Sequence, residues 1–191
     1  MSLPELKKDQ RYTYSDYCTW DDNKRWELID GVPYAMSPAP SPVHQRILME
    51  LAGQLFIFLK DKPCEVFTAP FDVRLNALDD DDDVVQPDIF VVCDHEKIDD
   101  KGLNGAPDMV IEILSPSTSR RDKVLKLNAY QRAGVREYWI VDPADKTVQV
   151  FILDNGRYLA ASHAETDIVT VHVLEGCEIS LPNVFSLKRQ K

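Results

Sequence analysis

The sequence predicts one α/β or α+β domain, in which two helices flank a central mixed sheet. Two apolar runs rich in β-branched residues, 84–93 and 107–114, have the pattern of strands buried on both faces. Two other stretches, 42–60 and 120–133, repeat apolar residues at helical spacing. A chain of 191 residues suffices for one sizeable core, so 1–191 is expected to form a single domain.

The N-terminal part is expected to be rich in β-structure. Residues 1–11 show no periodic pattern and are interpreted as a loose tail, whereas 13–20 is predicted to be a short helix. The runs 25–29 and 32–36 are separated by Asp30-Gly31, a dipeptide typical of the turn in a β-hairpin. The sequence therefore predicts an N-terminal hairpin.

The first long helix is predicted to begin after Ser41, with Pro42 in its first position, and to end at about Lys60. The segments 65–69 and 71–75 follow as two further strands. The apolar residues of the helix repeat on one face, which is typical of a helix that covers a sheet: Ile47, Leu48, Leu51, Leu55, Phe58 and Leu59.

Two polar segments interrupt the middle of the chain. Asp79 to Asp83 is a run of five aspartates, which we expect to be a solvated loop. Residues 94–106 are expected to be irregular. The two predicted buried strands, which carry Asp88 and Glu112, each follow one of these segments.

The second long helix, 120–133, is predicted to end at Gly134, because glycine favours the left-handed conformation that closes a helix. After the apolar strand 137–141, a hairpin is expected to join 148–153 to 157–162. One or two short strands then complete a β-rich C-terminal extension. The apolar residues of the first hairpin strand are a candidate interface for a homodimer.

Composition and charge narrow the function classes. The net charge of −10 argues against a general nucleic-acid binder, although it leaves room for a local basic strip. No apolar run is long enough to span a bilayer and no apolar signal segment opens the chain, so we expect a cytoplasmic protein without membrane contact. The four cysteines form no CxxC pair and are expected to be free thiols.

Two acidic residues lie within the predicted core strands. Asp88 and Glu112 are both surrounded by apolar neighbours, where an unpaired carboxylate costs several kcal/mol. If the two strands are neighbours, both carboxylates can bind one hard divalent cation. Mg²⁺ held in this way, or Mn²⁺ in its place, suits the hydrolysis of a phosphodiester, and a nearby lysine would stabilise the charge that develops.

The motif Pro-Asp followed by a carboxylate in a later apolar strand resembles the PD-(D/E)XK nuclease superfamily. A wider set of motifs, spread over residues 13–153, resembles the Uma-type restriction endonuclease family within it: ELIDG at 27–31, QPDIFVV at 86–92, EILSPSTSRRD at 112–122 and AGVREYWIVDP at 133–143. The resemblance implies a restriction-endonuclease-like fold, with a metal site at Asp88 and Glu112.

The chain departs from the superfamily at the catalytic lysine. The strand position two residues after Glu112 is Leu114, and the family resemblance assigns the lysine to Lys126 on the following helix. The alternative is an ordinary surface pair between Asp122 and Lys126. The resemblance also implies that Glu27 is an auxiliary catalytic acid, for which the alternative is an exposed strand residue.

Four further residues are candidates for substrate binding. The resemblance makes His44, at the start of the first long helix, a residue that lines the site; the alternative is a local hydrogen-bond partner. Arg120, Arg121 and Lys123 open the second long helix, where they could hold a phosphate of bound DNA. Their alternative is solvated surface, and Lys123 is also a substitute for Lys126.

Three functions therefore remain open from the sequence. The first is a Mg²⁺-dependent endonuclease that hydrolyses DNA, with Asp88, Glu112, Lys126 and Glu27 as its catalytic residues. The second is a catalytically inactive nuclease fold that serves as an interaction or DNA-binding module. The third is a metal-dependent hydrolase of a small phosphate ester, which suits the acidic net charge better than DNA does.

Overall fold

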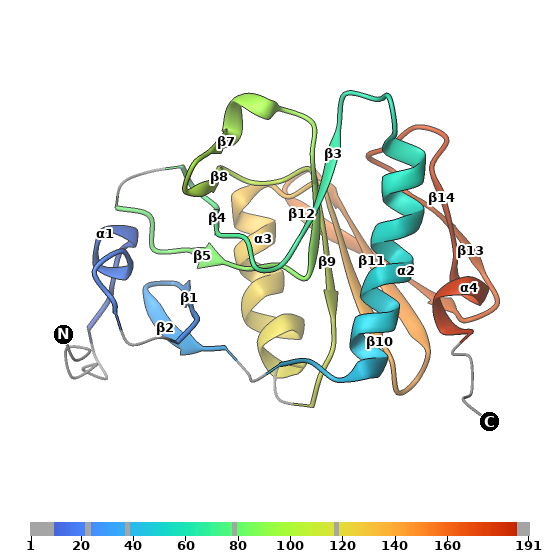
Figure 1. Cartoon of the computed structure of the whole chain (residues 1–191), viewed down its shortest axis with the longest axis horizontal. Coiled ribbons are helices and arrows are strands. Elements are labelled where there is room, and N and C mark those ends of the chain that lie inside the picture. The colour runs from blue at the N-terminus through green and yellow to red at the C-terminus, as the bar shows by residue number, and fades with distance from the viewer. Residues whose placement is uncertain (1–9, 22–23, 37–38, 78–79, 117–118, 187–191) are drawn as a thin grey trace.

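The computed structural model describes residues 10–21, 24–36, 39–77, 80–116 and 119–186, and the fold is α+β, as predicted (Figure 1). Its central sheet has the strand order β12-β11-β10-β9-β6-β3. β9 and β10 are parallel, and the other neighbours in this sheet are antiparallel. The six strands are β3 (Glu65–Thr68), β6 (Ile89–Val92), β9 (Met109–Ile113), β10 (Glu137–Asp142), β11 (Thr147–Asp154) and β12 (Arg157–Ala164).

A second six-stranded sheet, which the sequence predicted only in part, has the order β2-β1-β5-β4-β8-β7. The predicted strand 84–93 is divided between the two sheets, because its first two residues form β5 and its last part forms β6. Pro87 lies at the division, and a proline cannot donate to a strand ladder. The strands are β1 (Trp26–Ile29), β2 (Val32–Ala35), β4 (Val73–Arg74), β5 (Val84–Val85), β7 (Ile98–Asp99) and β8 (Gly102–Asn104).

Different elements cover the two faces of the central sheet (Figure 1). On one face lie α2 (Pro42–Leu59) and the C-terminal elements β13 (Ile168–Thr170), β14 (Glu178–Ser180) and α4 (Leu181–Phe185). On the other face lies α3 (Leu127–Ala133), with the second sheet beyond it. Each face has its own apolar cluster, so the central sheet is buried on both sides as its sequence predicted.

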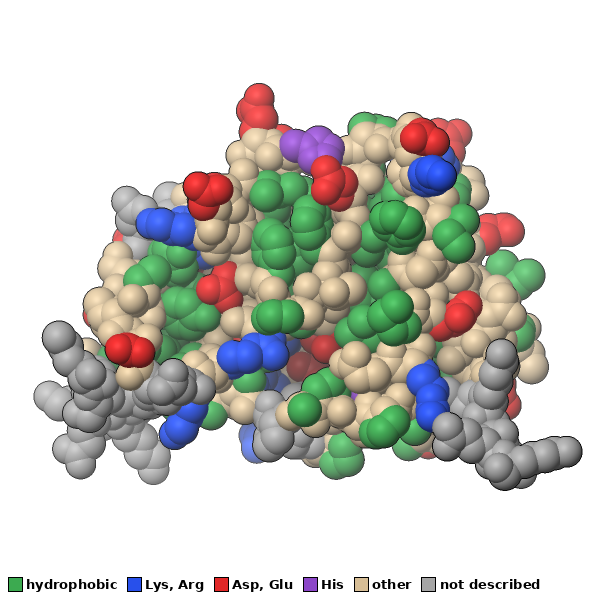
Figure 2. Space-filling model, in the orientation of Figure 1, with side chains coloured by type: hydrophobic (Ala, Val, Ile, Leu, Met, Phe, Trp, Pro, Cys, Tyr) green, Lys and Arg blue, Asp and Glu red, His purple; other side chains and the backbone are tan. Residues whose placement is uncertain are grey.

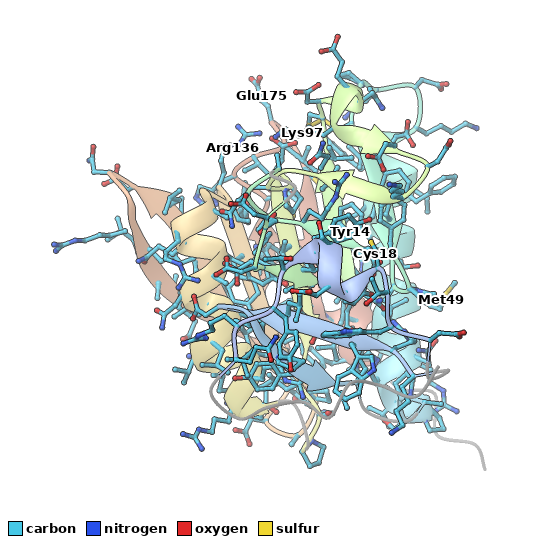
Figure 3. All side chains as sticks on the ribbon, turned by 90° about the vertical axis from the view of Figure 1, so that its left-hand side faces the viewer. Tyr14, Cys18, Met49, Lys97, Arg136 and Glu175 are labelled. Carbon is cyan, nitrogen blue, oxygen red and sulfur yellow. A yellow bond between two sulfur atoms is a disulfide. The ribbon has the colours of Figure 1, made fainter. Side chains whose placement is uncertain are left out.

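Helix α2 agrees with its prediction almost to the residue. Ser41 accepts a hydrogen bond from the backbone N–H of His44, Pro42 is the first helical residue, and the predicted apolar stripe faces the core. The short N-terminal helix α1 (Tyr14–Tyr17) has the capping box that its sequence indicates, formed by Thr13 and Asp16. In the view of Figure 3, α1 lies in front of the sheets, and the labelled residues Tyr14 and Cys18 mark its position.

The second long helix begins where it was predicted, but it is not α-helical throughout. Helical backbone starts at residues 119–120, Arg121–Lys126 then forms a π-helical turn, here called the π-turn, and α3 covers Leu127–Ala133. The end agrees with the prediction, since Gly134 has a φ of 84° in the left-handed region.

Two predictions about polar segments were wrong. The aspartate run is not simply a solvated loop, because Asp81 and Asp83 are buried and accept hydrogen bonds from backbone N–H groups of Asn76 and Asp30. Residues 94–106 are not irregular, since they contain a 3₁₀ turn and the strands β7 and β8. In both segments short-range turns and sheet pairing satisfy polar groups that the sequence pattern left unassigned.

The prediction of four free thiols was also wrong. Cys64 and Cys93 form a disulfide, whereas Cys18 and Cys177 are free. The two bonded cysteines directly flank the paired residues Glu65 and Val92 of β3 and β6. The cysteine pattern therefore no longer supports a reducing compartment for this chain.

The hairpin residues considered for a homodimer differ in exposure. Val148 and Val150 of β11 are buried in the apolar cluster on the α2 face, whereas Phe151, Ile152 and Leu153 are only partly buried. In the described part of the chain, no helix has the length and apolar character needed to cross a bilayer.

Candidate active site

A cavity of about 920 Å³ opens at one edge of the central sheet, where β9 and β10 end and both α2 and the π-turn begin. Figure 2 shows one face of the molecule, and acidic and basic side chains lie recessed together in a hollow in the lower half of this view. Six of the eight predicted site residues line this cavity: Glu27, His44, Asp88, Glu112, Arg121 and Lys126. Ligands commonly bind outside the carboxyl ends of strands in such sheets.

Asp88 lies just before β6, and its side chain is fixed by two partners. Its Oδ2 atom accepts a hydrogen bond from the backbone N–H of Ile113 at 2.8 Å. The same oxygen lies 3.2 Å from Nε2 of His44, which comes from the first turn of α2. This arrangement connects Asp88 to the strand of Glu112, so the two carboxylates that the sequence singled out lie at one site.

Glu112 belongs to β9 and points to the α3 face of the sheet, together with Val110 and Leu114. Lys126 Nζ lies 2.8 Å from Glu112 Oε1, and the Tyr130 hydroxyl donates to the same oxygen at 2.8 Å. Both Glu112 and Lys126 are only 3% exposed. The helix thus delivers an ammonium group to the strand carboxylate, although the strand position Leu114 carries none.

Glu27 of β1 approaches the same lysine from the second sheet. Its Oε1 atom lies 2.7 Å from Lys126 Nζ and accepts the backbone N–H of Gln86 at 3.0 Å. Its Oε2 atom accepts a hydrogen bond from Arg121 at 3.0 Å. With 1% exposure, Glu27 is not the exposed strand residue that was the alternative prediction.

The residues around the π-turn divide into two groups. Arg121, Asp122 and Lys126 line the cavity, and the buried Asp122 lies 3.9 Å from Lys126, so this pair is not the surface pair considered above. Lys123 is exposed on another side of the turn, where it forms a 3.7 Å ion pair with Asp142, and Arg120 is exposed as well. Neither Arg120 nor Lys123 lines the cavity.

The cluster perturbs the pKa values of its members in different directions. Burial raises the pKa of Glu112 to about 8, helped by neighbouring carboxylates and opposed by Lys126. Burial would also raise the pKa of Glu27, but Lys126, the Gln86 N–H and Arg121 outweigh it and lower that pKa. Burial would lower the pKa of Lys126, but the surrounding carboxylates raise it far above its ordinary value, so the amine stays charged.

The donor set fits a hydrated divalent cation. Among the described residues, no group of three His, Cys, Asp or Glu side chains is arranged to hold a metal ion. Mg²⁺, however, commonly uses one or two carboxylates and keeps waters or substrate oxygens for the rest. The cavity lining carries a formal surplus of two negative charges, from Glu27, Asp88, Glu112, Asp122 and Asp142 against Arg25, Arg121 and Lys126.

Three residues of the site were not predicted from the sequence. Asp122 was considered only as a surface partner, Tyr130 was not considered, and Gln86 was noted only within a motif. Gln86 donates its backbone N–H to Glu27, and its side chain bonds Arg25 and Asp72. A signal was available for Asp122 and Tyr130, because they lie four residues either side of Lys126 and thus near its helical face.

The fold matches that of a solved structure. A crystal structure from Anabaena variabilis, described as a "putative nuclease belonging to DUF820", superposes with a TM-score of 0.73. It covers 91% of this chain and 97% of that chain, at 22% sequence identity. The two proteins therefore share their fold.

A family model also matches the sequence. The model of the Uma2 family, described as "Putative restriction endonuclease", matches residues 13–182, and the chain belongs to this family. An uncharacterized protein of Synechocystis sp. is 25% identical over 156 residues, which cover 80% of each chain. The resemblance that the motifs indicated is confirmed.

Proposed function

We propose that this protein is a Mg²⁺-dependent endonuclease that hydrolyses phosphodiester bonds of DNA at the cavity described above. The observation that carries the proposal is the 2.8 Å contact between Lys126 Nζ and Glu112 Oε1, beside Asp88. A buried, charged amine next to two carboxylates suits phosphodiester hydrolysis, because the carboxylates can hold a metal ion and the amine can stabilise developing negative charge.

Asp88 and Glu112 would hold the metal ion. When bound, Mg²⁺ supplies Lewis acidity and helps to activate a water molecule. Asp88 is well suited to this role, because the Ile113 N–H and His44 fix its Oδ2 atom at the cavity wall. Mn²⁺ has similar oxygen preferences and would replace Mg²⁺.

Lys126 would act as a fixed positive charge. Because the surrounding carboxylates raise its pKa, the charged ammonium form is favoured, which suits a fixed charge better than a base that deprotonates water. Its ammonium group instead stabilises negative charge on phosphate oxygens as the bond breaks. Arg121, which also lines the cavity, would bind a phosphate of the DNA.

The acidic net charge is compatible with this substrate when binding is local. Arg25, Arg121 and Lys126 are the basic residues that line the cavity, and Arg120 and Lys123 lie exposed beside it on the same helical segment. The exposed pair would contact DNA backbone outside the cavity and would make binding sensitive to salt. A homodimer would present two such cavities to the two strands of a duplex.

Cleavage of supercoiled plasmid tests the proposal. The wild-type protein is expected to nick plasmid with Mg²⁺ or Mn²⁺ and to lose this activity with EDTA. Asp88→Asn should abolish nicking, whereas Asp154→Asn, a matched change of an exposed aspartate in the β11–β12 hairpin, should retain it. Metal-dependent nicking by Asp88→Asn at the wild-type rate would contradict the assigned site.

The two alternatives have their own outcomes in the same assay. DNA binding without cleavage by the wild-type protein would favour an inactive nuclease fold. Hydrolysis of a chromogenic phosphodiester without nicking of DNA would favour a hydrolase of small esters. Light scattering tests the homodimer, which would have twice the chain mass of 21.8 kDa.

A further inference from the structure

We propose that Glu27 is a positioning residue, whose carboxylate bridges the two ends of the π-turn and thereby sets Lys126 against Glu112. This inference deepens the proposed function and rests on it. It assigns to Glu27 a role distinct from that of an auxiliary acid or a metal ligand. The distinction follows from the partners of its two carboxylate oxygens.

Both oxygens of Glu27 are already occupied by this chain. Oε1 contacts Lys126 Nζ at 2.7 Å and the Gln86 N–H at 3.0 Å, and Oε2 accepts from Arg121 at 3.0 Å. A carboxylate with three donors in these positions is held as a structural bridge. Its side chain is 2% exposed, so no solvent path competes with these contacts.

The π-turn explains why one carboxylate can reach both cations. Arg121 and Lys126 are five residues apart, and in an α-helix residues at this spacing lie about 140° apart around the axis. A π-helix closes its hydrogen bonds from i to i+5, which brings the two side chains onto one face. The unusual turn and the Glu27 bridge therefore depend on each other.

The bridge also joins the two sheets at the site. Glu27 belongs to β1 of the second sheet, whereas Glu112 belongs to β9 of the central sheet, and Lys126 lies between them. The ring of Tyr34, in the neighbouring strand β2, lies 5.1 Å from the Arg121 guanidinium. The N-terminal hairpin, formed by β1 and β2, thus contacts the π-turn from the side opposite the central sheet.

Glu27→Gln, Glu27→Asp and the control Glu178→Gln separate this role from others. Glutamine keeps the shape but loses the charge, and aspartate keeps the charge but is one methylene too short to span both cations. Glu178 is an exposed strand glutamate of β14, so it controls for the substitution itself. If Glu27 is a bridge, both changes at Glu27 should lower kcat by about tenfold or more, with little change in KM.

A second measurement does not depend on activity. Amide hydrogen exchange of residues 121–126 should become faster in both Glu27 variants, while exchange of β10 and of the Glu178→Gln control stays as in the wild type. Unchanged exchange in the π-turn of Glu27→Gln would overturn the inference. So would a Glu27→Asp variant with wild-type kcat, because charge without reach would then suffice.

These outcomes are distinguishable from a failure of the proposed function. If the wild-type protein cleaves no DNA with Mg²⁺, the endonuclease proposal fails, while the exchange measurement still decides whether Glu27 holds the π-turn. If the wild type cleaves DNA and the Glu27 variants cleave equally well, only the positioning role fails.

Discussion

Both faces of the central sheet bury an apolar cluster, but the charged groups that they bury are very different. On the α2 face, a regular and well-capped helix packs an apolar stripe against Ile111 and Trp139. On the other face, the helical segment contains the π-turn and buries Lys126 beside Glu112 and Glu27. The first face is largely apolar and holds its buried Glu137 through hydrogen bonds from Trp139 and Val173, whereas the second keeps costly ion pairs, which is typical of functional sites.

The largest effect is expected from removing the cation of the charged face. Lys126→Met should lower the rate of plasmid cleavage by about 10²–10³-fold, because the developing phosphate charge loses its partner. The free energy of unfolding should also fall by about 3–5 kcal/mol, since buried carboxylates remain without compensation. Single-turnover cleavage and urea unfolding measure the two effects. Lys60→Met, at an exposed position after α2, should change neither.

A charge-neutral version of the cluster separates stability from function. The triple change Lys126→Met, Glu27→Gln and Glu112→Gln should recover most of the lost unfolding free energy, because well-packed neutral groups replace buried ions at little cost. Its cleavage rate should be no higher than that of Lys126→Met. A triple variant as unstable as Lys126→Met would show that packing of the lysine stem, rather than charge, dominates on this face.

On the apolar face, the free energy of unfolding should depend on how tightly the side chains pack. Leu51 of α2 is fully buried, and Leu51→Ala should lower the free energy of unfolding by about 2–5 kcal/mol. Met49 of the same helix is 66% exposed and points away from the sheet (Figure 3), so Met49→Ala should change stability by less than about 0.5 kcal/mol. Cleavage per folded molecule should stay near the wild-type value in both variants. A large loss of kcat in Leu51→Ala would mean that the two faces are coupled.

The difference between the two faces also explains which structural elements could be predicted from the sequence. Apolar periodicity and capping residues predicted α2 closely, because these signals act within one helix. The π-turn within the second helix could not be predicted in the same way, since it contacts Glu27 from a distant strand. The Cys64–Cys93 disulfide was missed for the same reason, because it depends on the register of β3 and β6.

The candidate site was predicted in its residues more than in its geometry. The pairing of Asp88 with Glu112 was inferred from their apolar surroundings, whereas the assignment of Lys126 came from family resemblance. Burial of Asp122 and the hydroxyl of Tyr130 on Glu112 appear only when the helix is placed against β9. Hydrogen bonds between distant elements leave no periodic signal, so several strands of the second sheet were predicted, but their assembly into one sheet and the strands β7 and β8 were not.

Two buried glutamates should give opposite pH dependences of stability. Glu27 has a lowered pKa because its cations outweigh burial, so it stabilises the fold above its unfolded pKa of about 4.5, and this contribution is lost as the pH falls. Glu137 of β10 has a raised pKa, because burial outweighs its hydrogen bonds from Trp139 and Val173. The native state then holds that proton to higher pH, so the free energy of unfolding falls as the pH rises above about 4.5.

Urea unfolding between pH 4 and 8 measures the two slopes. Relative to the wild type, Glu27→Gln should lose most stability at neutral pH and least at acid pH. Glu137→Gln should instead gain relative stability as the pH rises. Parallel pH profiles for the two variants would show that the two faces treat a buried carboxylate alike, against the structural difference in their partners.

The smallest expected effect concerns the point where the apolar helix reaches the site. Ser41 Oγ accepts the backbone N–H of His44, and the His44 ring contacts Asp88. Ser41→Ala should therefore cost about 1 kcal/mol of unfolding free energy and also lower kcat several-fold, because the cap fixes the turn that orients His44. Thr13→Ala removes the equivalent cap of α1, which does not line the cavity, and should cost a similar free energy at unchanged kcat. Equal kcat values for the two variants would mean that α2 supports the sheet alone and that Asp88 is held by the Ile113 N–H without help from His44.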